Sequence, residues 1–227
     1  MTTRIWQTTA VIAALAALTV VPNAYAHKPV VINGGPTDAE TAHQIDDVDV
    51  SQVGYHHAKP GQPELWFAFD VKPGEELFVQ LGVPKLDRYE GLRPAMALIG
   101  PGLPDADVPF YVPQGYGGIV YDMAEVEPEV FHEEFTGTTS WQFPAEEPTV
   151  NVGGTYYLVG YLPGEDEGKF WMAVGVKEQF GLADILTLPQ TLFQVRAFHE
   201  VQPFGGILFW AMAAVFALLT FLVFRVV

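Results

Sequence analysis

The chain has 227 residues, of which 49% are hydrophobic and 17% charged, and its formal net charge is −16. This length is enough to build a hydrophobic core in one domain with short appendages. Eleven basic residues against 27 acidic ones, with no basic cluster, argue against nucleic-acid binding. Because the chain has no cysteine, disulfides, thiolate metal sites and cysteine nucleophiles are excluded.

The N-terminal segment has the three parts of a secretory signal peptide. Arg4 supplies the positive charge, residues 10–21 form a short apolar run, and Ala24-Tyr25-Ala26 is a small-x-small cleavage site. We therefore expect a signal peptide over residues 1–26 and a mature chain that begins with His27. The alternative, an uncleaved N-terminal anchor, stays open at this point.

The polar, acidic residues 27–50 are expected to form a loosely structured arm that leads into the folded domain. Two pairs of strands follow, each with apolar residues at every second position. The first pair is 65–71 with 77–83, and the second is 155–162 with 169–176. Pro and Gly lie between the members of each pair, which predicts two hairpins.

Shorter strands are predicted at 94–99 and 130–135. Many short strands with Pro/Gly turns and no helical period predict an all-β fold, an antiparallel, jelly-roll-like β-sandwich over residues 51–180. Residues 100–118 contain several Pro and Gly together with aromatic residues, which indicates an ordered loop lying on the sandwich. This sandwich would form the part of the protein outside the membrane.

An aromatic surface is expected beside that loop. If one parity of the strand 155–162 is buried, the other parity turns two tyrosines outward. An exposed aromatic row on one molecule marks a contact surface for a protein or glycan partner. The alternative is that the loop covers the row. The candidate binding residues are Tyr157, Tyr161, Phe110, Tyr111 and Tyr116.

Beyond residue 180 the period changes to three or four. Residues 181–203 predict a short amphipathic juxtamembrane segment, divided by Pro189 into two helical pieces, which lies on the bilayer or under the sandwich. Residues 204–224 carry no charge and are long enough to form a transmembrane helix. Residues 225–227 would be a cytoplasmic tail. The expected location is the cytoplasmic membrane, single-pass, with the sandwich outside.

The chain resembles a group of poorly characterised exported, membrane-anchored bacterial β-sandwich proteins over about residues 50–201. Its strand pairs are also similar to those of pre-peptidase C-terminal and emp24/GOLD-type sandwiches. The resemblance implies a β-sandwich that serves binding or assembly rather than catalysis. The residues that carry it are Ser51, Tyr55, Trp66, Phe67, Phe69, Gly74, Val83, Pro84, Gly154 to Leu158, Gly168 to Gly175, Glu178, Phe180 to Asp184, Pro189 and Arg196 to Val201.

Histidines are the candidate metal ligands. Cleavage after Ala26 would give His27 a free α-amine beside its imidazole, a bidentate nitrogen chelate suited to Cu(II) that one more histidine would complete. His56 and His57 are adjacent, so on a strand they point to opposite faces and do not easily chelate one ion together. His132 would share a strand face with Glu134, which suits a hard cation or a solvated face. Copper is the one cofactor considered.

Catalytic patterns are lacking. Serine occurs only at Ser51 and Ser140, there is no G-x-S-x-G pattern, and no glycine loop for phosphate precedes a helix. The sequence therefore predicts a non-enzymatic, membrane-anchored, extracytoplasmic binding or assembly module. Two alternatives remain: an extracytoplasmic copper-binding protein that uses His27, and an accessory subunit of a larger membrane complex.

Overall fold

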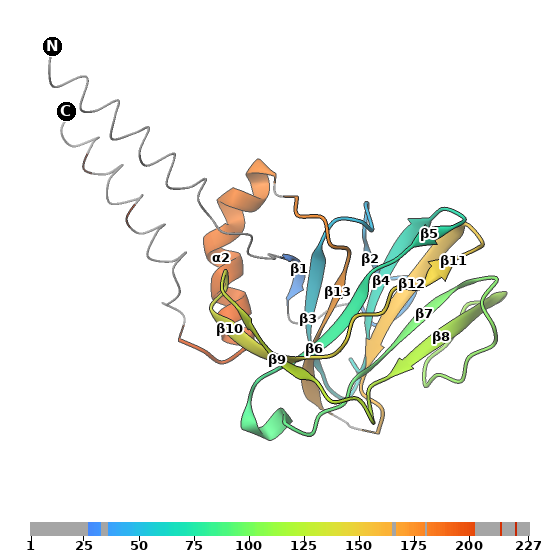
Figure 1. Cartoon of the computed structure of the whole chain (residues 1–227), viewed down its shortest axis with the longest axis horizontal. Coiled ribbons are helices and arrows are strands. Elements are labelled where there is room, and N and C mark those ends of the chain that lie inside the picture. Colours follow the sequence, from blue (N-terminus) through green and yellow to red (C-terminus); the bar gives the residue numbers. More distant parts are fainter. Residues whose placement is uncertain are drawn as a thin grey trace, which may run out of the picture.

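The computed structural model describes residues 27–32, 36–164, 167–179 and 181–202, together with Ala214 and Phe221. Two large sheets face each other, and a helix lies outside one of them (Figure 1). The six-stranded sheet has the order β1 (Lys28–Ile32), β3 (Gln52–Ala58), β13 (Gly168–Val174), β6 (Val79–Pro84), β10 (Thr138–Gln142), β9 (Glu129–Glu133). The five-stranded sheet has the order β2 (His43–Gln44), β4 (Leu65–Val71), β12 (Gly154–Tyr161), β7 (Ala95–Pro101), β8 (Tyr116–Asp122). A small sheet pairs β5 (Glu75–Glu76) with β11 (Thr149–Val150). The 3₁₀ helix η1 (Asp87–Tyr89) follows β6, and the helix α2 (Leu182–Phe198) follows β13.

Alternating apolar side chains build the core between the sheets. On β4, Phe67 and Phe69 point into it and are fully buried, and on β6 Val79 and Leu81 meet them from the opposite sheet. Burying such rows is the main favourable term in folding, at roughly 25 cal/mol per Å² of apolar area. The expected inward faces of both strands are therefore confirmed, and the predicted short strands at 94–99 and 130–135 correspond to β7 and β9.

The predicted hairpin of 65–71 with 77–83 is wrong. β4 pairs with β2 and β12, whereas β6 pairs with β10 and β13 in the other sheet. Between them the chain crosses the edge of the sandwich, where Gly74 has a φ of 83° and its N–H donates to the carbonyl of Val150 at 2.7 Å. A period of two specifies which face of a strand is buried, but it does not specify the neighbouring strand.

The second predicted hairpin is wrong in the same way. β12 lies between β4 and β7, and β13 lies between β3 and β6 of the opposite sheet. Both pairs therefore pack face to face across the core instead of edge to edge. The sheets are also not wholly antiparallel, because β1 pairs with β3, and β2 with β4, in parallel.

Residues 27–50, expected as a loosely structured arm, contribute to both sheets within their described part. β1 forms one edge of the six-stranded sheet and β2 one edge of the five-stranded sheet. Ile45 and Val48 are buried in the core. The acidic composition concealed these few apolar residues, which suffice to attach a segment whose remaining side chains face water.

The helix α2 is continuous through Pro189, so the expected division into two pieces is wrong. Proline removes one helical hydrogen bond. Packing compensates, because Val195 and Phe198 are buried against the outer face of the six-stranded sheet (Figure 1). Near the other end, Asp184 pairs with Lys28 of β1 at 2.9 Å. The segment 181–203 was expected to lie either on the bilayer or under the sandwich, and its described part packs against the sandwich.

The predicted signal peptide (1–26), membrane span (204–224) and tail (225–227) lie outside the described residues, apart from Ala214 and Phe221. In the part of the chain that the structure describes, no helix combines the length and the apolar character needed to cross a bilayer.

Candidate functional site

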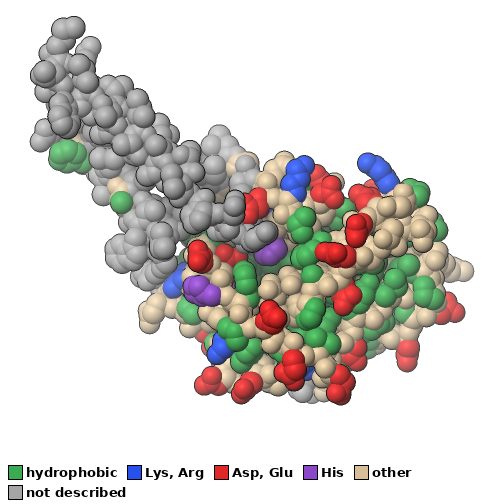
Figure 2. Space-filling model, viewed as in Figure 1, with side chains coloured by type: hydrophobic (Ala, Val, Ile, Leu, Met, Phe, Trp, Pro, Cys, Tyr) green, Lys and Arg blue, Asp and Glu red, His purple; other side chains and the backbone are tan. Residues whose placement is uncertain are grey.

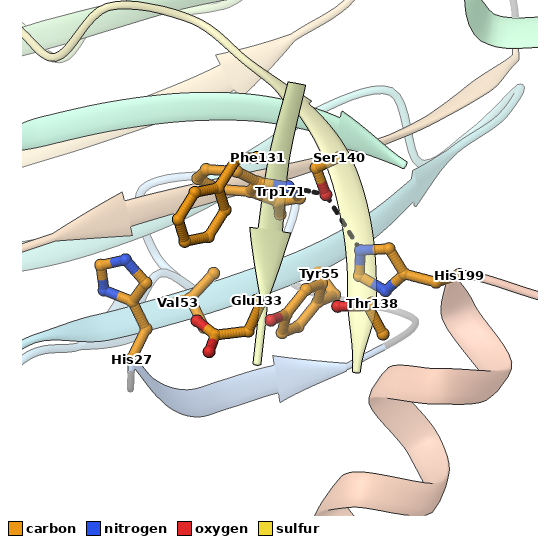
Figure 3. A pocket seen from close by; sticks show the side chains of 9 residues that line it. All are labelled: His27, Val53, Tyr55, Phe131, Glu133, Thr138, Ser140, Trp171 and His199. Carbon is orange, nitrogen blue, oxygen red and sulfur yellow. Dashed lines mark hydrogen bonds between the residues drawn. The ribbon is translucent and has the colours of Figure 1, made fainter. Parts of the chain in front are cut away.

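The outer face of the six-stranded sheet carries a small cavity beside α2 (Figure 3). Trp171 of β13 lies flat over β6 because position 82 is glycine; a Cβ there would come within 2.1 Å of the indole. In Figure 3, His27 lies on one side of the cavity and His199 on the other. About 20 Å³ is accessible in it, room for roughly one water molecule. The lining residues are His27, Val53, Tyr55, Phe131, Glu133, Thr138, Ser140, Trp171 and His199.

A wider groove of about 230 Å³ adjoins the cavity, and His27 and Phe131 line both. Its walls combine apolar and hydrogen-bonding side chains. Gln80 donates to the carbonyl of Phe143 at 2.9 Å, and Gln142 donates to Gln80 at 3.1 Å, so the two amides are held in place. The groove is lined by His27, Ser51, Phe78, Gln80, Phe131, Gln142, Val176 and Glu178.

A buried chain of hydrogen bonds joins the end of α2 to the sheet. The indole N–H of Trp171 donates to Ser140 Oγ at 3.0 Å, and Ser140 Oγ lies 3.2 Å from His199 Nε2. His199 Nδ1 lies 2.9 Å from the carbonyl oxygen of Val195. Because a carbonyl only accepts, Nδ1 carries the proton and Nε2 accepts from Ser140. The network is complete when His199 is neutral.

Charged residues attach the same end of the helix. Arg196, 7% exposed, donates to the carbonyls of Thr136 at 2.6 Å and Gln202 at 2.7 Å. Lys169 donates to Glu200 Oε1 at 2.7 Å and to the carbonyl of Phe198 at 2.9 Å. We call residues 196–202 with these partners the exit clamp, since the chain leaves the described domain here.

The exit clamp is completed by Arg88 of η1, which also pairs with Glu200. Hydrogen bonds from Arg88 and Lys169 lower the pKa of Glu200 to about 2. Glu200 has a φ of 58°, a left-handed conformation that costs a non-glycine residue free energy. The ion pairs therefore hold the backbone in a conformation that it would not otherwise favour.

Burial shifts three further titratable groups around the cavity. It lowers the pKa of His199 to about 4, with Lys169 and Arg196 acting in the same direction. It lowers the pKa of His27, an effect that Glu178 opposes. Burial raises the pKa of Glu133, and Glu178 adds to that rise. Burial therefore favours the neutral forms of these three groups, while Glu178 lines the groove.

The histidines predicted as metal ligands do not meet. His56 is fully buried and its Nε2 donates to the carbonyl of Gln62 at 3.0 Å. His57 points the other way to Glu167 Oε1 at 2.9 Å, as adjacent strand residues must. His132 lies 3.1 Å from Thr139 Oγ1, and His27 Nδ1 contacts Ser51 Oγ. Among the described residues, no group of three or more His, Asp or Glu could hold a metal ion.

The predicted aromatic binding surface is covered, so it is wrong as an exposed site. Tyr161 is buried and Tyr157 half-buried. The ring of Phe110 packs on Tyr161 at 5.4 Å between centroids, and Tyr116 lies 5.9 Å from Tyr157. Tyr111 alone of the five stays largely exposed, at 77%. The strand turned its tyrosines outward as expected, and the loop's apolar residues buried them.

Sequence reasoning missed the residues of the true cavity, above all Trp171, Ser140 and His199. One signal was available: Trp171 lies on the outward parity of a strand whose inward parity is already apolar. An outward tryptophan needs a cover, and the apolar face of residues 192–198 could supply one. That Ser140 and His199 would meet under that cover depends on strand pairing, which the pattern does not give.

Comparisons with known proteins give only weak likenesses in shape. No family model matches the chain, and no curated protein matches it. Among solved structures, the pre-peptidase C-terminal domain of a collagenase from Bacillus anthracis aligns with 63% of this chain and 99% of its own. The identity is 13% and the TM-score 0.32, so the likeness carries no conclusion about ligand, partner or activity.

Ser140 and His199 have the contact of a nucleophile and its base, but both are buried and Ser140 Oγ also accepts from Trp171. The third partner is a backbone carbonyl within α2. These contacts join the helix to the sheet, and the adjoining groove offers an open surface.

Proposed function

We propose that the chain is a non-enzymatic binding or assembly module, anchored outside the cytoplasmic membrane, that takes a protein or glycan partner in the groove beside His27. The groove is the observation that carries this proposal. It combines the apolar side chains of Phe78, Phe131 and Val176 with the amides of Gln80 and Gln142. Apolar contact area with a few fixed polar groups is typical of ligand sites.

The surface supports an extracytoplasmic binding role. Acidic side chains are spread over the face of the domain seen in Figure 2, and Lys and Arg are few. Such a charge keeps a protein soluble and disfavours anionic partners. The anchor in this proposal is the apolar segment 204–224, and the exit clamp fixes the domain where that segment begins.

The test is recovery of the full chain from native membranes in mild detergent, with mass spectrometry of what co-purifies. Val176 is 57% exposed in the groove. Val176→Lys should reduce the amount of partner that co-purifies by at least about tenfold. The matched control is Val120→Lys, since Val120 is exposed on β8 of the other sheet. Equal recovery of the partner with both variants would remove the groove from the proposal.

A second candidate is copper binding through the mature N-terminus. The observation that favours it is that the imidazole of His27 lines the groove together with the carboxylate of Glu178. An α-amine, an imidazole nitrogen and a carboxylate oxygen are ligands that Cu(II) accepts.

Copper analysis of the chain that begins at His27 tests this candidate. We expect one copper ion per chain, lost when a single residue is added before His27 because the α-amine becomes an amide. Copper retained by the extended chain would place the ion at a site that does not use the α-amine of His27, and would remove this candidate.

A further inference from the structure

The exit clamp contains one buried imidazole, that of His199, whose protonation conflicts with its hydrogen bond to Ser140 and with the charges of Lys169 and Arg196. His199 is 3% exposed and lies at the point where α2 ends. Its Nδ1 must donate to Val195, so a second proton would have to enter at Nε2. Nε2 then could no longer accept from Ser140, and the Ser140 hydroxyl would lose its acceptor while Trp171 still donates to it.

The charges that face His199 come from several elements. On its own helix and just after it lie Arg196 and Glu200, on β13 lies Lys169, and Tyr55 of β3 packs edge-on at 5.6 Å. Glu133 of β9 and His27 line the same cavity. Lys169 and Arg196 oppose a positive imidazole, and the carboxylate of Glu200, the next residue in the chain, is already paired with Lys169 and Arg88. A charged imidazole in this place is therefore poorly compensated.

We propose that the exit clamp is an acid-released latch: protonation of His199 detaches the C-terminal end of α2 from β10 and β13 and opens the cavity over Trp171. In neutral conditions the latch holds the domain rigidly where the chain leaves it. In acid the helix end lifts, and the small cavity becomes continuous with the groove beside it. Binding in the groove would then depend on pH through a residue that does not line the groove.

The direction follows from linkage. The docked His199 has a pKa of about 4, while a released, solvated histidine titrates near 6.5. Above that range neither state binds the proton and the latch stays closed. As the pH falls from 6.5 to about 4, the released state gains the proton first, and the released-to-docked ratio rises by about 80-fold.

Fluorine NMR of the full chain in detergent micelles, labelled with 5-fluorotryptophan, tests the latch. Trp171 reports on the latch, and Trp66, buried on the opposite sheet, reports on global unfolding. Between about pH 7 and pH 4 we expect the Trp171 signal to move toward a solvated position while the Trp66 signal stays. The midpoint of the Trp171 transition should coincide with the midpoint of His199 protonation, which is measured by NMR of the imidazole in the same sample.

His199→Gln should abolish the transition, and the matched control His57→Gln, at a half-buried position on β3, should leave it unchanged. A Trp171 signal that is constant down to pH 4, or that moves together with Trp66, overturns the latch. So does a transition that persists in His199→Gln with the same midpoint. If the helix end is already released at neutral pH in His199→Gln, the wild-type chain gives the test. The latch is wrong if the midpoint of the Trp171 transition differs from the midpoint of His199 protonation in that chain.

Discussion

Each large sheet of the sandwich buries one tryptophan on its outer face, and the two covers differ. Trp66 of β4 lies under the loop 102–115, with the ring of Phe110 at 5.0 Å, and its indole N–H has no hydrogen-bond partner in the described structure. Trp171 of β13 lies under the end of α2, and its indole N–H is bonded to Ser140. One cover is made by aliphatic and aromatic packing without a hydrogen bond to the indole, the other by packing and a polar network.

The difference shows how the two sheets divide their tasks. Burial of apolar area needs no matched donor and acceptor, and the tyrosines of this cover do not titrate near neutral pH, because burial raises the pKa of Tyr157 and Tyr161 further. The polar cover needs each donor and acceptor in place, and it leaves an open groove at its side. The first cover has no group that titrates near neutral pH, whereas the second contains His199, on whose protonation the proposed latch depends.

Removing either tryptophan should give the largest loss of stability. Trp66→Ala and Trp171→Ala each delete a side chain at most 5% exposed, and each should lower the free energy of unfolding by about 3–5 kcal/mol. Denaturant titration measures both. Trp171→Ala should also raise the solvent accessibility of α2, which Trp66→Ala should leave unchanged. Equal protection of the α2 amides from hydrogen exchange in the two variants would contradict the claim that each tryptophan has its own cover.

The core histidine should make global stability fall in acid. The pKa of His56 is lowered to about 4 by burial, so the unfolded chain takes up the proton first below pH 6.5. This one group then removes about 1.4 kcal/mol of stability per pH unit down to about pH 4, separately from His199, whose pKa burial lowers in the same way. His56→Gln should flatten this slope in denaturant titrations at several pH values, and His57→Gln should not. A slope unchanged in His56→Gln would assign the acid sensitivity elsewhere.

Opening the aromatic cover should have a moderate effect. Phe110 is half-buried against Trp66 and Tyr161, so Phe110→Ala should lower stability by about 1–2 kcal/mol. Fluorescence quenching of Trp66 by acrylamide should rise. The acid transition of Trp171 should keep its midpoint, because the two covers lie on opposite sheets. A shifted midpoint would show that the faces are coupled through the core.

The sequence predicts the faces of the strands better than their partners. The rows that contain Phe67 and Leu81 are buried as their alternation requires, because a period of two distinguishes inside from outside. It does not distinguish a hairpin from two strands that cross the sandwich, since both arrangements bury the same rows. The acidic arm was misjudged because pairing of β1 uses backbone hydrogen bonds, which composition does not reveal.

The candidate site was predicted only in part. His27 was singled out for its place after the cleavage motif, and it does line both the cavity and the groove. The aromatic surface failed because the sequence specifies an outward tyrosine but not whether the loop 102–115 folds over it. Ser140 and His199 lie far apart in sequence, and only the order of β6, β10 and β13 brings them under one helix end.

The smallest predicted effect concerns the conformation of Glu200. Glu200→Gln removes the charge that pairs with Lys169 and Arg88 but keeps the side chain at a φ of 58°. Glu200 is about 40% exposed, so water screens these pairs and their loss should cost less than about 1 kcal/mol. Glu200→Gly removes the same pairs and also the left-handed strain, which costs a residue with a Cβ about 1 kcal/mol. The glycine variant should therefore be the more stable of the two in denaturant titration, by about that amount.

The glycine variant should also loosen the exit clamp, since glycine lets the backbone leave the left-handed conformation freely. If the glycine variant is less stable than the glutamine variant, the exit clamp depends on packing of the Glu200 side-chain carbons against their neighbours. The cover of Trp171 would then rest on apolar packing as the cover of Trp66 does, and the two covers would differ less than described above.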